Sequence, residues 1–229
     1  MEAIILAGGF GTRLSTVVSD VPKPMAPING KPFLELLLED LEKKGITKVI
    51  LATGYKKEII KNYFKDRYRS IEIVYSEEIY PLGTGGAIKK AIALAKGNDI
   101  FIVNGDTFFD VDLEEMYKFH RKNNSKLTLA IKKMEKFDRY GSLILEGNRI
   151  IKFEEKKYIE KGFINGGIYL INREILKENF KENFSFEKEI LENSDNRIEK
   201  YGYISNNYFI DIGIPEDYYK FNKLKLEVR

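Results

Sequence analysis

Short apolar runs alternate with longer segments of helical period through the first half of the chain. The apolar runs predict strands at residues 3–7, 48–52, 72–75 and 100–104. Between them, apolar residues spaced three and four apart predict helices near 33–44, 57–64, 85–94 and 113–122. Gly45 follows the first of these helices, at the position where a left-handed glycine commonly closes one. This alternation is typical of βα units that build a largely parallel sheet.

The pattern changes after Asn124. Strands are predicted at 127–132, 142–145, 150–154, 167–171 and 208–211, with fewer and shorter helices, so this half should extend or flank the sheet. Pro215, followed by Glu216 and Asp217, predicts the start of a terminal helix that runs through Lys225. We therefore expect a single α/β domain over residues 1–229, with three α/β/α layers around a mostly parallel mixed sheet.

The composition narrows the class of protein. With 229 residues, 43% hydrophobic and 32% charged, the chain is suited to one packed globular domain. Its net charge of +3 is too small to indicate a nucleic-acid or membrane partner. The absence of cysteine excludes disulfides and a thiol nucleophile. No signal-peptide pattern and no run of about 18 apolar residues is present, so we expect a cytoplasmic protein.

The first predicted strand runs into the glycine-rich segment Gly8-Gly9-Phe10-Gly11-Thr12-Arg13. Glycines without Cβ atoms let backbone amides approach an anion closely, which favours a phosphate cradle. A tight βα turn would show the same glycines about as often. The dinucleotide and P-loop patterns are both incomplete here. Arg13 favours a polyphosphate ligand over a plain turn.

Lys23 lies between Pro22 and Pro24. Prolines on both sides restrict its backbone, so we expect a stiff, extended platform for the ammonium group. An exposed loop lysine is the alternative. With Arg13 ten residues earlier, we interpret Lys23 as a phosphate ligand.

Two aspartates follow predicted strands. Asp106 comes after the apolar strand that ends at Asn104, and Asp211 ends the strand at 208–211. Open α/β sheets bind ligands at the carboxyl ends of their strands. Two carboxylates could hold Mg²⁺, with water and phosphate oxygens completing the shell. Each could equally lie in a plain turn, and their spacing does not show that they meet.

The segment from Gly8 to Leu14, followed by Pro22-Lys23-Pro24, resembles the signature of the sugar-phosphate nucleotidyltransferase family, and the resemblance extends over essentially the whole chain. It implies a Rossmann-like fold with a nucleotide-binding half at 1–124 and a sugar-phosphate-binding half at 125–229. It further implies that Asp106 and Asp211 share one Mg²⁺, with Arg13, Lys23 and Asp106 as catalytic residues. The implied nucleotide site comprises Leu6, Ala7, Gly8, Gly9, Gly11, Thr12, Arg13, Lys23, Glu78, Gly83, Thr84, Asn104 and Asp106.

The second glycine-rich loop, which includes Gly83 and Thr84, resembles the family segment that packs against the base and ribose. Just before it, Glu77 and Glu78 would point to opposite sides of an extended chain. A carboxylate can accept both N–H donors on the edge of guanine, whereas uracil or thymine would present carbonyl oxygens to it. Counting back from Leu82, as the family does, favours Glu78. We therefore predict GTP as the nucleotide.

The resemblance places the sugar phosphate against Gly141, Glu155, Lys156 and Asn165. By residue type alone, these positions could be turns, strand edges or a solvated charge run. The implied reaction transfers GMP from GTP to a sugar 1-phosphate and releases pyrophosphate. D-glycero-α-D-manno-heptose 1-phosphate is the sugar we expect, and a homodimer is the assembly we consider.

Several alternatives stay open. They are mannose 1-phosphate with GTP, phosphocholine with CTP, a non-catalytic nucleotide-sugar sensor, and a nicotinamide-dependent dehydrogenase. Glu78 speaks against CTP, and the incomplete glycine pattern speaks against the dehydrogenase.

Overall fold

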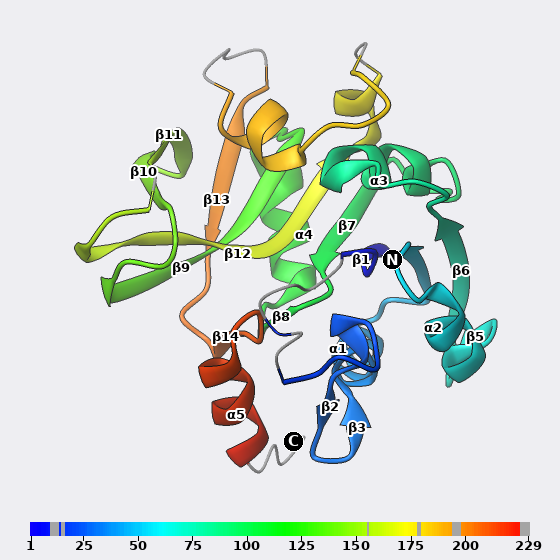
Figure 1. Cartoon of the computed structure of the whole chain (residues 1–229). Helices are drawn as coiled ribbons and strands as arrows, with labels where there is room; N and C mark the ends of the chain where they lie inside the picture. The colour runs from blue at the N-terminus through cyan, green and yellow to red at the C-terminus, as the bar shows by residue number, and fades with distance from the viewer. Residues whose placement is uncertain (10–13, 15–16, 155, 178–179, 194–197, 225–229) are drawn as a thin grey trace.

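A ten-stranded mixed sheet runs through the molecule (Figure 1). This computed structural model describes residues 1–9, 14, 17–154, 156–177, 180–193 and 198–224. The strand order is β10-β11-β13-β9-β12-β7-β1-β4-β6-β5. Strands from both halves of the chain therefore belong to one sheet, and the antiparallel contact between β12 and β7 joins the halves.

The first half forms the parallel part of the sheet. Its parallel strands are β1 (Glu2–Leu6), β4 (Lys48–Thr53), β6 (Ile71–Glu77) and β7 (Asp99–Asn104). The helices of this half are α1 (Phe33–Lys43), α2 (Lys57–Phe64), α3 (Gly83–Ile92) and α4 (Leu113–Lys122). The predicted alternation is confirmed, with α3 beginning two residues earlier than expected. The short edge strand β5 (Arg67–Tyr68), which pairs antiparallel with β6, was not predicted.

The second half adds mostly antiparallel strands, of which β9 and β12 are the longest. They are β9 (Leu127–Phe137), β10 (Ser142–Glu146), β11 (Arg149–Glu154), β12 (Ile159–Asn172) and β13 (Lys200–Ile204). Only β13 and β9 pair in parallel here, so the parallel pairings lie mainly in the first half. β13 was not predicted. Its short sequence contains Gly202, and it is recognisable as a strand only through its pairing with β9 and β11.

Both faces of the sheet are covered, which gives the three layers. Along β1, Ala3 and Ile5 pack into the core beneath α1, α2, α4 and α5, while Ile4 packs on the opposite side against α3. This alternation follows from the two-residue period of a strand. No helix in the described part of the chain combines the length and apolar surface that a bilayer crossing requires.

Two small antiparallel pairs lie outside the main sheet. One joins β2 (Pro27–Ile28) to β3 (Lys31–Pro32), and the other joins β8 (Thr107–Phe109) to β14 (Phe209–Asp211). The strand predicted at 208–211 thus pairs with β8 and not with the main sheet. Helix α5 (Pro215–Lys223) follows, with its predicted proline and acidic first turn. Lys225, the predicted end of that helix, lies outside the described residues.

Local sequence signals explain the ends of several elements. Gly45 has φ +80°, and its N–H and that of Ile46 close α1 on the carbonyls of Glu42 and Leu41, as a glycine C-cap predicts. The expectation of an extended platform at Lys23 is wrong. Lys23 begins the short 3₁₀ helix η1 (Lys23–Met25). The flanking prolines tolerate it because its hydrogen bonds use the N–H groups of Met25 and Ala26 and need none from proline.

Candidate active site

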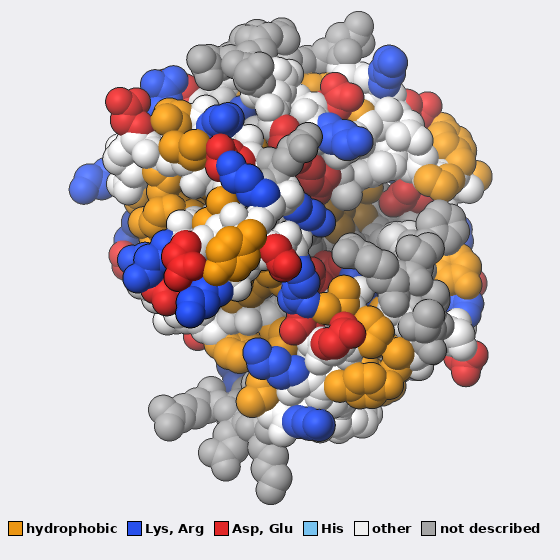
Figure 2. Space-filling model, turned by 60° about the vertical axis from the view of Figure 1, so that its left-hand side comes forward, with side chains coloured by type: hydrophobic (Ala, Val, Ile, Leu, Met, Phe, Trp, Pro, Cys, Tyr) orange, Lys and Arg blue, Asp and Glu red, His pale blue; other side chains and the backbone are white. Residues whose placement is uncertain are grey.

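Two cavities share a wall at the carboxyl edge of the parallel strands. Cavity A, about 390 Å³, borders β1, β4, β7 and the start of α3. Cavity B, about 480 Å³, lies on the side of β10, β11, β12 and β14. Asn104 and Glu187 line both. Figure 2 shows a hollow on one face of the molecule with acidic and basic side chains around it. The arrangement can hold two ligands that meet end to end.

Cavity A is built from strand ends. Leu6, Ala52 and Asn104, at or near the ends of β1, β4 and β7, line it. Ala7, a predicted site residue, does not line cavity A: its side chain is fully buried in the core, and its N–H donates to the Ala52 carbonyl. This is the ligand-binding edge expected for an open α/β sheet.

Gly8 and Glu78 pack closely at the floor of cavity A. A Cβ on Gly8 would lie 2.7 Å from Glu78 Oε1, so glycine is required for this approach. Glu78 Oε2 accepts the N–H of Leu82 at 2.9 Å, which fixes the direction of the carboxylate. Both Gly8 and Glu78 line the cavity, together with Gly9. A ligand in cavity A would therefore meet the backbone of Gly8 and Gly9 and the carboxylate of Glu78.

Glu77 faces away from cavity A. Its carboxylate binds Lys57 at 2.7 Å and Lys61 at 2.8 Å. Hydrogen bonds from these two ammonium groups lower the pKa of Glu77 to about 2. Of the two adjacent glutamates, the structure thus places Glu78 in the cavity and Glu77 in a surface ion-pair network.

Lys23 and Asp106 form an ion pair in the wall of cavity A. The ammonium lies 2.5 Å from Asp106 Oδ2, and the lysine side chain is only 11% exposed. The carboxylate is more accessible, at 34%. At this wall the buried ammonium can offset the negative charge of a phosphate, and the accessible carboxylate can bind a cation.

Asp211 reaches the same place through the β8–β14 pair. Asp211 is paired with Thr107, and the N–H of Ile212 donates to the carbonyl of Asp106 at 2.9 Å. A Cβ on Gly213 would lie 2.7 Å from Asp211 Oδ1 and 2.8 Å from Lys23 Nζ. The two aspartates and the lysine therefore meet around Gly213, which the sequence spacing could not show.

The two aspartates are suited to a hard cation. No group of three or more histidine, cysteine or acidic side chains gathers as a metal cluster among the described residues. Two carboxylates alone leave most positions of an octahedral shell to water or to ligand oxygens, which is how Mg²⁺ commonly binds beside phosphates. The donor chemistry of Asp106 and Asp211 fits such a cation.

The glycines at the start of α3 have two different roles. Gly83 and Thr84 line cavity A. Gly85 and Gly86 do not, because a Cβ on Gly85 would overlap the Phe184 ring and a Cβ on Gly86 would lie 2.2 Å from the Glu182 carbonyl. Gly85 and Gly86 therefore serve close packing alone, whereas Gly83, where a Cβ would lie 2.5 Å from the Phe184 carbonyl, both packs closely and lines the cavity.

Glu187, which no sequence motif predicted, links the two cavities. It begins the short π-helical turn η3 (Glu187–Leu191). Its Oε2 accepts hydroxyl hydrogen bonds from Thr84 at 2.5 Å and from Ser185 at 2.9 Å. The surrounding sequence is rich in lysine and glutamate, so nothing local distinguished it from a solvated charge run. Only its contact with Thr84, 103 residues away, identifies it.

A bulge in β12 directs Asn165 into cavity B. The register with β9 shifts between Asn165 and Tyr169, and Gly167 within the bulge has φ +74°. Asn165 donates to the Tyr169 hydroxyl at 2.8 Å and accepts the Gly167 N–H at 3.0 Å. A Cβ on Gly167 would lie 2.9 Å from Asn104 Nδ2. The bulge thus holds Asn165 in cavity B and lets Gly167 pack closely against Asn104 in the shared wall.

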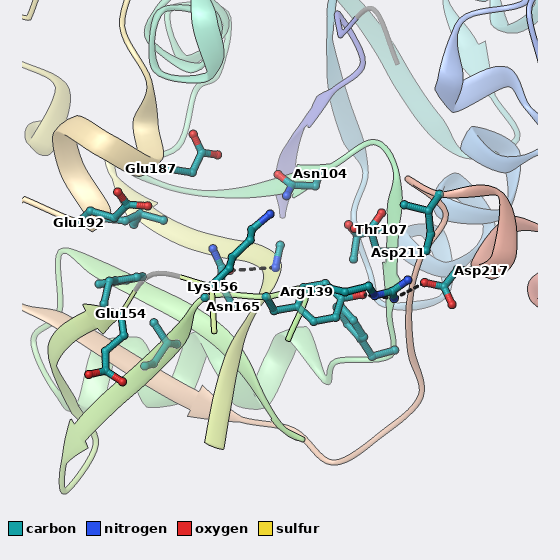
Figure 3. Close-up of a pocket in the computed structure, with 18 residues that line it drawn as sticks. Asn104, Thr107, Arg139, Glu154, Lys156, Asn165, Glu187, Glu192, Asp211 and Asp217 are labelled. Atoms are coloured by element: carbon teal, nitrogen blue, oxygen red, sulfur yellow. Dashed lines mark hydrogen bonds and ion pairs between the residues drawn. The ribbon is translucent and has the colours of Figure 1, made fainter. Parts of the chain in front are cut away.

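Charged side chains line the remaining wall of cavity B (Figure 3). Lys156 is exposed toward solvent, and its side chain extends into the cavity. Gly141 packs against the Glu154 carbonyl, where a Cβ would lie at 2.7 Å. At the other end, Arg139 binds Asp217. Of the predicted sugar-phosphate residues, Gly141, Lys156 and Asn165 therefore line one cavity.

Four predicted site residues, Gly11, Thr12, Arg13 and Glu155, lie outside the described residues.

The chain is similar to proteins of one family over nearly its whole length. A family model described as nucleotidyl transferase matches residues 2–227. Over 224 residues the chain is 53% identical to the D-glycero-alpha-D-manno-heptose 1-phosphate guanylyltransferase of Aneurinibacillus thermoaerophilus, covering 97% of each chain. It is 52% identical over 223 residues to the protein of the same name from Campylobacter jejuni, covering 96% of this chain and 98% of that one.

A solved structure agrees with these relatives. The crystal structure of HddC from Yersinia pseudotuberculosis complexed with GMP-PN is 37% identical and superposes with a TM-score of 0.85, covering 96% of this chain and 97% of that one. The resemblance seen in the segment from Gly8 to Leu14 and around Lys23 is confirmed by the match at residues 2–227. The chain belongs to the nucleotidyl transferase family.

Proposed function

We propose that this chain transfers GMP from GTP to D-glycero-α-D-manno-heptose 1-phosphate, forming GDP-heptose and pyrophosphate. The names of the two bacterial relatives support the nucleotide and the sugar. The observation that carries the proposal is the meeting of Lys23, Asp106 and Asp211 in the region where cavities A and B adjoin. Two phosphate-bearing substrates placed in the two cavities would have their phosphates at this cluster.

In this proposal GTP occupies cavity A. Backbone groups of Gly8, Gly9 and Gly83 border the nucleotide, with Leu6, Thr84 and Asn104 beside it. Gly11, Thr12 and Arg13 would continue the loop around the triphosphate. Glu78 would accept the two donors of guanine. A carboxylate offers about four lone-pair sites, so the bond from Leu82 leaves room for both.

The sugar 1-phosphate occupies cavity B. Lys156 brings a positive charge toward its phosphate, which must approach an already anionic triphosphate. Asn165 is held by Tyr169 and so offers a fixed amide to the ring hydroxyls. Gly141, directly before β10, lines the sugar cavity with its backbone, and Glu155 is proposed to accept sugar hydroxyls. The metal is proposed to be Mg²⁺, held by Asp106 and Asp211; when bound, it would neutralise charge on the reacting phosphates.

The proposed reaction is a single displacement at phosphorus. An oxygen of the sugar 1-phosphate forms a bond to the α-phosphorus of GTP, and the bond from that phosphorus to the bridging oxygen of the β-phosphate breaks. Pyrophosphate leaves with the electron pair. The attacking oxygen is already anionic, so the chain needs no general base. Lys23 and Arg13 would stabilise the charge that develops on the phosphates, and the cavity walls would align the two substrates.

The experiment is a substrate panel. The protein is incubated with Mg²⁺, one nucleoside triphosphate at a time, and either the heptose 1-phosphate or mannose 1-phosphate, and pyrophosphate release is measured. The proposal predicts the highest kcat/KM for GTP with the heptose 1-phosphate. Equal turnover of GTP and UTP would contradict the base assignment, and a preference for mannose 1-phosphate would contradict the sugar assignment.

A further inference from the structure

Cavity B adjoins a smaller cavity at its Arg139 end. This neighbour, cavity C, has a volume of about 200 Å³. Five residues line both cavities: Arg139, Tyr140, Phe209, Asp211 and Asp217. Four of the five carry polar groups. A ligand in cavity B that is longer than a six-carbon sugar could therefore extend into cavity C past polar side chains.

An ion pair marks the boundary between cavities B and C. Arg139 Nη2 donates to Asp217 Oδ2 at 2.5 Å and to the Tyr140 hydroxyl at 3.2 Å. Asp217 is largely buried, with 17% of its side chain exposed, whereas Arg139 is 45% exposed. Both bonds use Nη2, and no hydrogen bond joins Nε or Nη1 to another described residue. At the boundary between cavities B and C, the pair thus offers a ligand the remaining N–H donors of Arg139 and the carboxylate of Asp217.

The pair is held by its surroundings. Asp217 lies in the first turn of α5, directly after Pro215 and Glu216. The Arg139 guanidinium lies 5.5 Å from the centre of the Tyr140 ring, and that ring packs edge-on against Phe209 at 5.8 Å. A guanidinium stacked on an aromatic ring loses less freedom when it binds a ligand. These contacts restrict the Arg139 side chain, so Arg139 and Asp217 are better suited to bind a ligand than a mobile surface pair would be.

We propose that Arg139 and Asp217 recognise the exocyclic C6–C7 diol of the seven-carbon sugar phosphate, with cavity C receiving its end; this rests on the proposed function. The heptose has the manno ring of mannose, but it carries a two-carbon diol where mannose carries one CH₂OH group. A vicinal diol both donates and accepts hydrogen bonds. The guanidinium offers matching donors and the carboxylate a matching acceptor.

The opposite end of cavity B fits a diol less well. There cavity B adjoins another cavity of about 200 Å³ through Phe153, Leu191 and Glu192. Phe153 and Leu191 have no side-chain hydrogen-bonding group, so that boundary offers a diol only one carboxylate. A hydroxyl buried without a partner is unfavourable. The Arg139 end therefore fits the longer sugar better.

The test compares two sugars in the same variants. Arg139→Gln and Asp217→Asn are assayed with GTP and either the heptose 1-phosphate or mannose 1-phosphate. Loss of a charged hydrogen bond should lower kcat/KM for the heptose about tenfold to a hundredfold, while the value for mannose stays within about threefold. Arg149→Gln is the matched control, because Arg149 is similarly exposed at 42% and pairs with Glu199 away from cavities B and C.

Binding of the products extends the test beyond turnover. Calorimetry with GDP-heptose and GDP-mannose should show the same selective loss for the heptose, and it applies even if mannose 1-phosphate is turned over slowly. An equal loss for both sugars would overturn the inference, since it would indicate a structural role. A wild-type enzyme that uses GTP but does not distinguish the sugars would also overturn it. Failure of the wild-type protein to turn over either sugar would instead contradict the proposed function itself.

Discussion

The nearly buried ammonium of Lys23 forms an ion pair with the more accessible carboxylate of Asp106, and it also lies beside Asp211 and the backbone of Gly213. The ammonium therefore occupies space next to both carboxylates proposed to hold a cation. A divalent cation and the ammonium should repel each other there, because like charges at such distances interact strongly in a partly buried site.

The first prediction is that Lys23→Ala separates cation binding from turnover. Removing the ammonium should strengthen binding of Mn²⁺ without nucleotide by about tenfold, since a competing positive charge is lost. Turnover should fall by about 10² to 10³, the usual cost of losing one stabilising group for developing charge. Mn²⁺ titration by electron paramagnetic resonance and pyrophosphate release measure the two effects.

Lys118→Ala is the control for Lys23→Ala. Lys118 is exposed, pairs with Glu114 and Glu115 on α4, and lines none of cavities A, B and C. It should change neither Mn²⁺ binding nor turnover. Near-normal turnover in Lys23→Ala would count heavily against the proposed mechanism.

The second prediction concerns Gly213. A Cβ at this position would lie within 3 Å of both Asp211 Oδ1 and Lys23 Nζ, closer than such atoms pack. Gly213→Ala should therefore displace the lysine and the aspartate and lower kcat by at least about tenfold. Circular dichroism should show the fold intact. Unchanged kcat would mean that the cluster around Gly213 does not take part in catalysis.

The third prediction concerns the choice of base. Glu78→Gln replaces an acceptor-only group by an amide, which can accept only one of the two guanine donors well and sets an N–H₂ group against the other. The ratio of kcat/KM for GTP over UTP should fall about tenfold to a hundredfold, more than kcat for GTP falls. Steady-state kinetics with both nucleotides measure this.

Glu77→Gln controls for the loss of a neighbouring carboxylate. Glu77 binds Lys57 and Lys61 outside cavity A, so its replacement should leave base preference unchanged. If Glu78→Gln keeps the wild-type preference, then a backbone group or another side chain of cavity A reads the base.

The fourth prediction is a pH dependence of stability due to Glu77. Its pKa in the fold is about 2, below its ordinary value of 4.5. A depressed carboxyl pKa stabilises the fold above pH 4.5 and loses this contribution as the pH falls toward 2. Urea unfolding at pH 7, 4 and 3 should show wild type more stable than Glu77→Gln at pH 7, with the difference shrinking at lower pH. A difference that grows on acidification would contradict the ion-pair account.

The sequence predicted the local elements well and the long-range pairings poorly. Strand and helix signals in the first half are local, since they depend on apolar period and on residues such as Gly45. The meeting of Asp106 and Asp211 depends on the pairing of β8 with β14, which are far apart in the chain. Sequence spacing alone carries no information about such a pairing, so only the family resemblance suggested it.

The same limit applies to Glu187 and to two glycines at the start of α3. Gly85 and Gly86 are required by packing against Phe184 and Glu182, and no local sequence pattern indicates these partners. Glu187 was not predicted, because only its contact with Thr84 places it in the shared wall. In each case the partner is about a hundred residues away, beyond the reach of any local pattern.

The most direct test of the central proposal follows a label on GTP. The protein is incubated with Mg²⁺, the heptose 1-phosphate and GTP carrying ³²P at either the α or the γ position, and the products are separated. The proposed displacement predicts α-label in GDP-heptose and γ-label in pyrophosphate. No sugar nucleotide from α-labelled GTP, or γ-label released as inorganic phosphate in an assay free of pyrophosphatase, would contradict it.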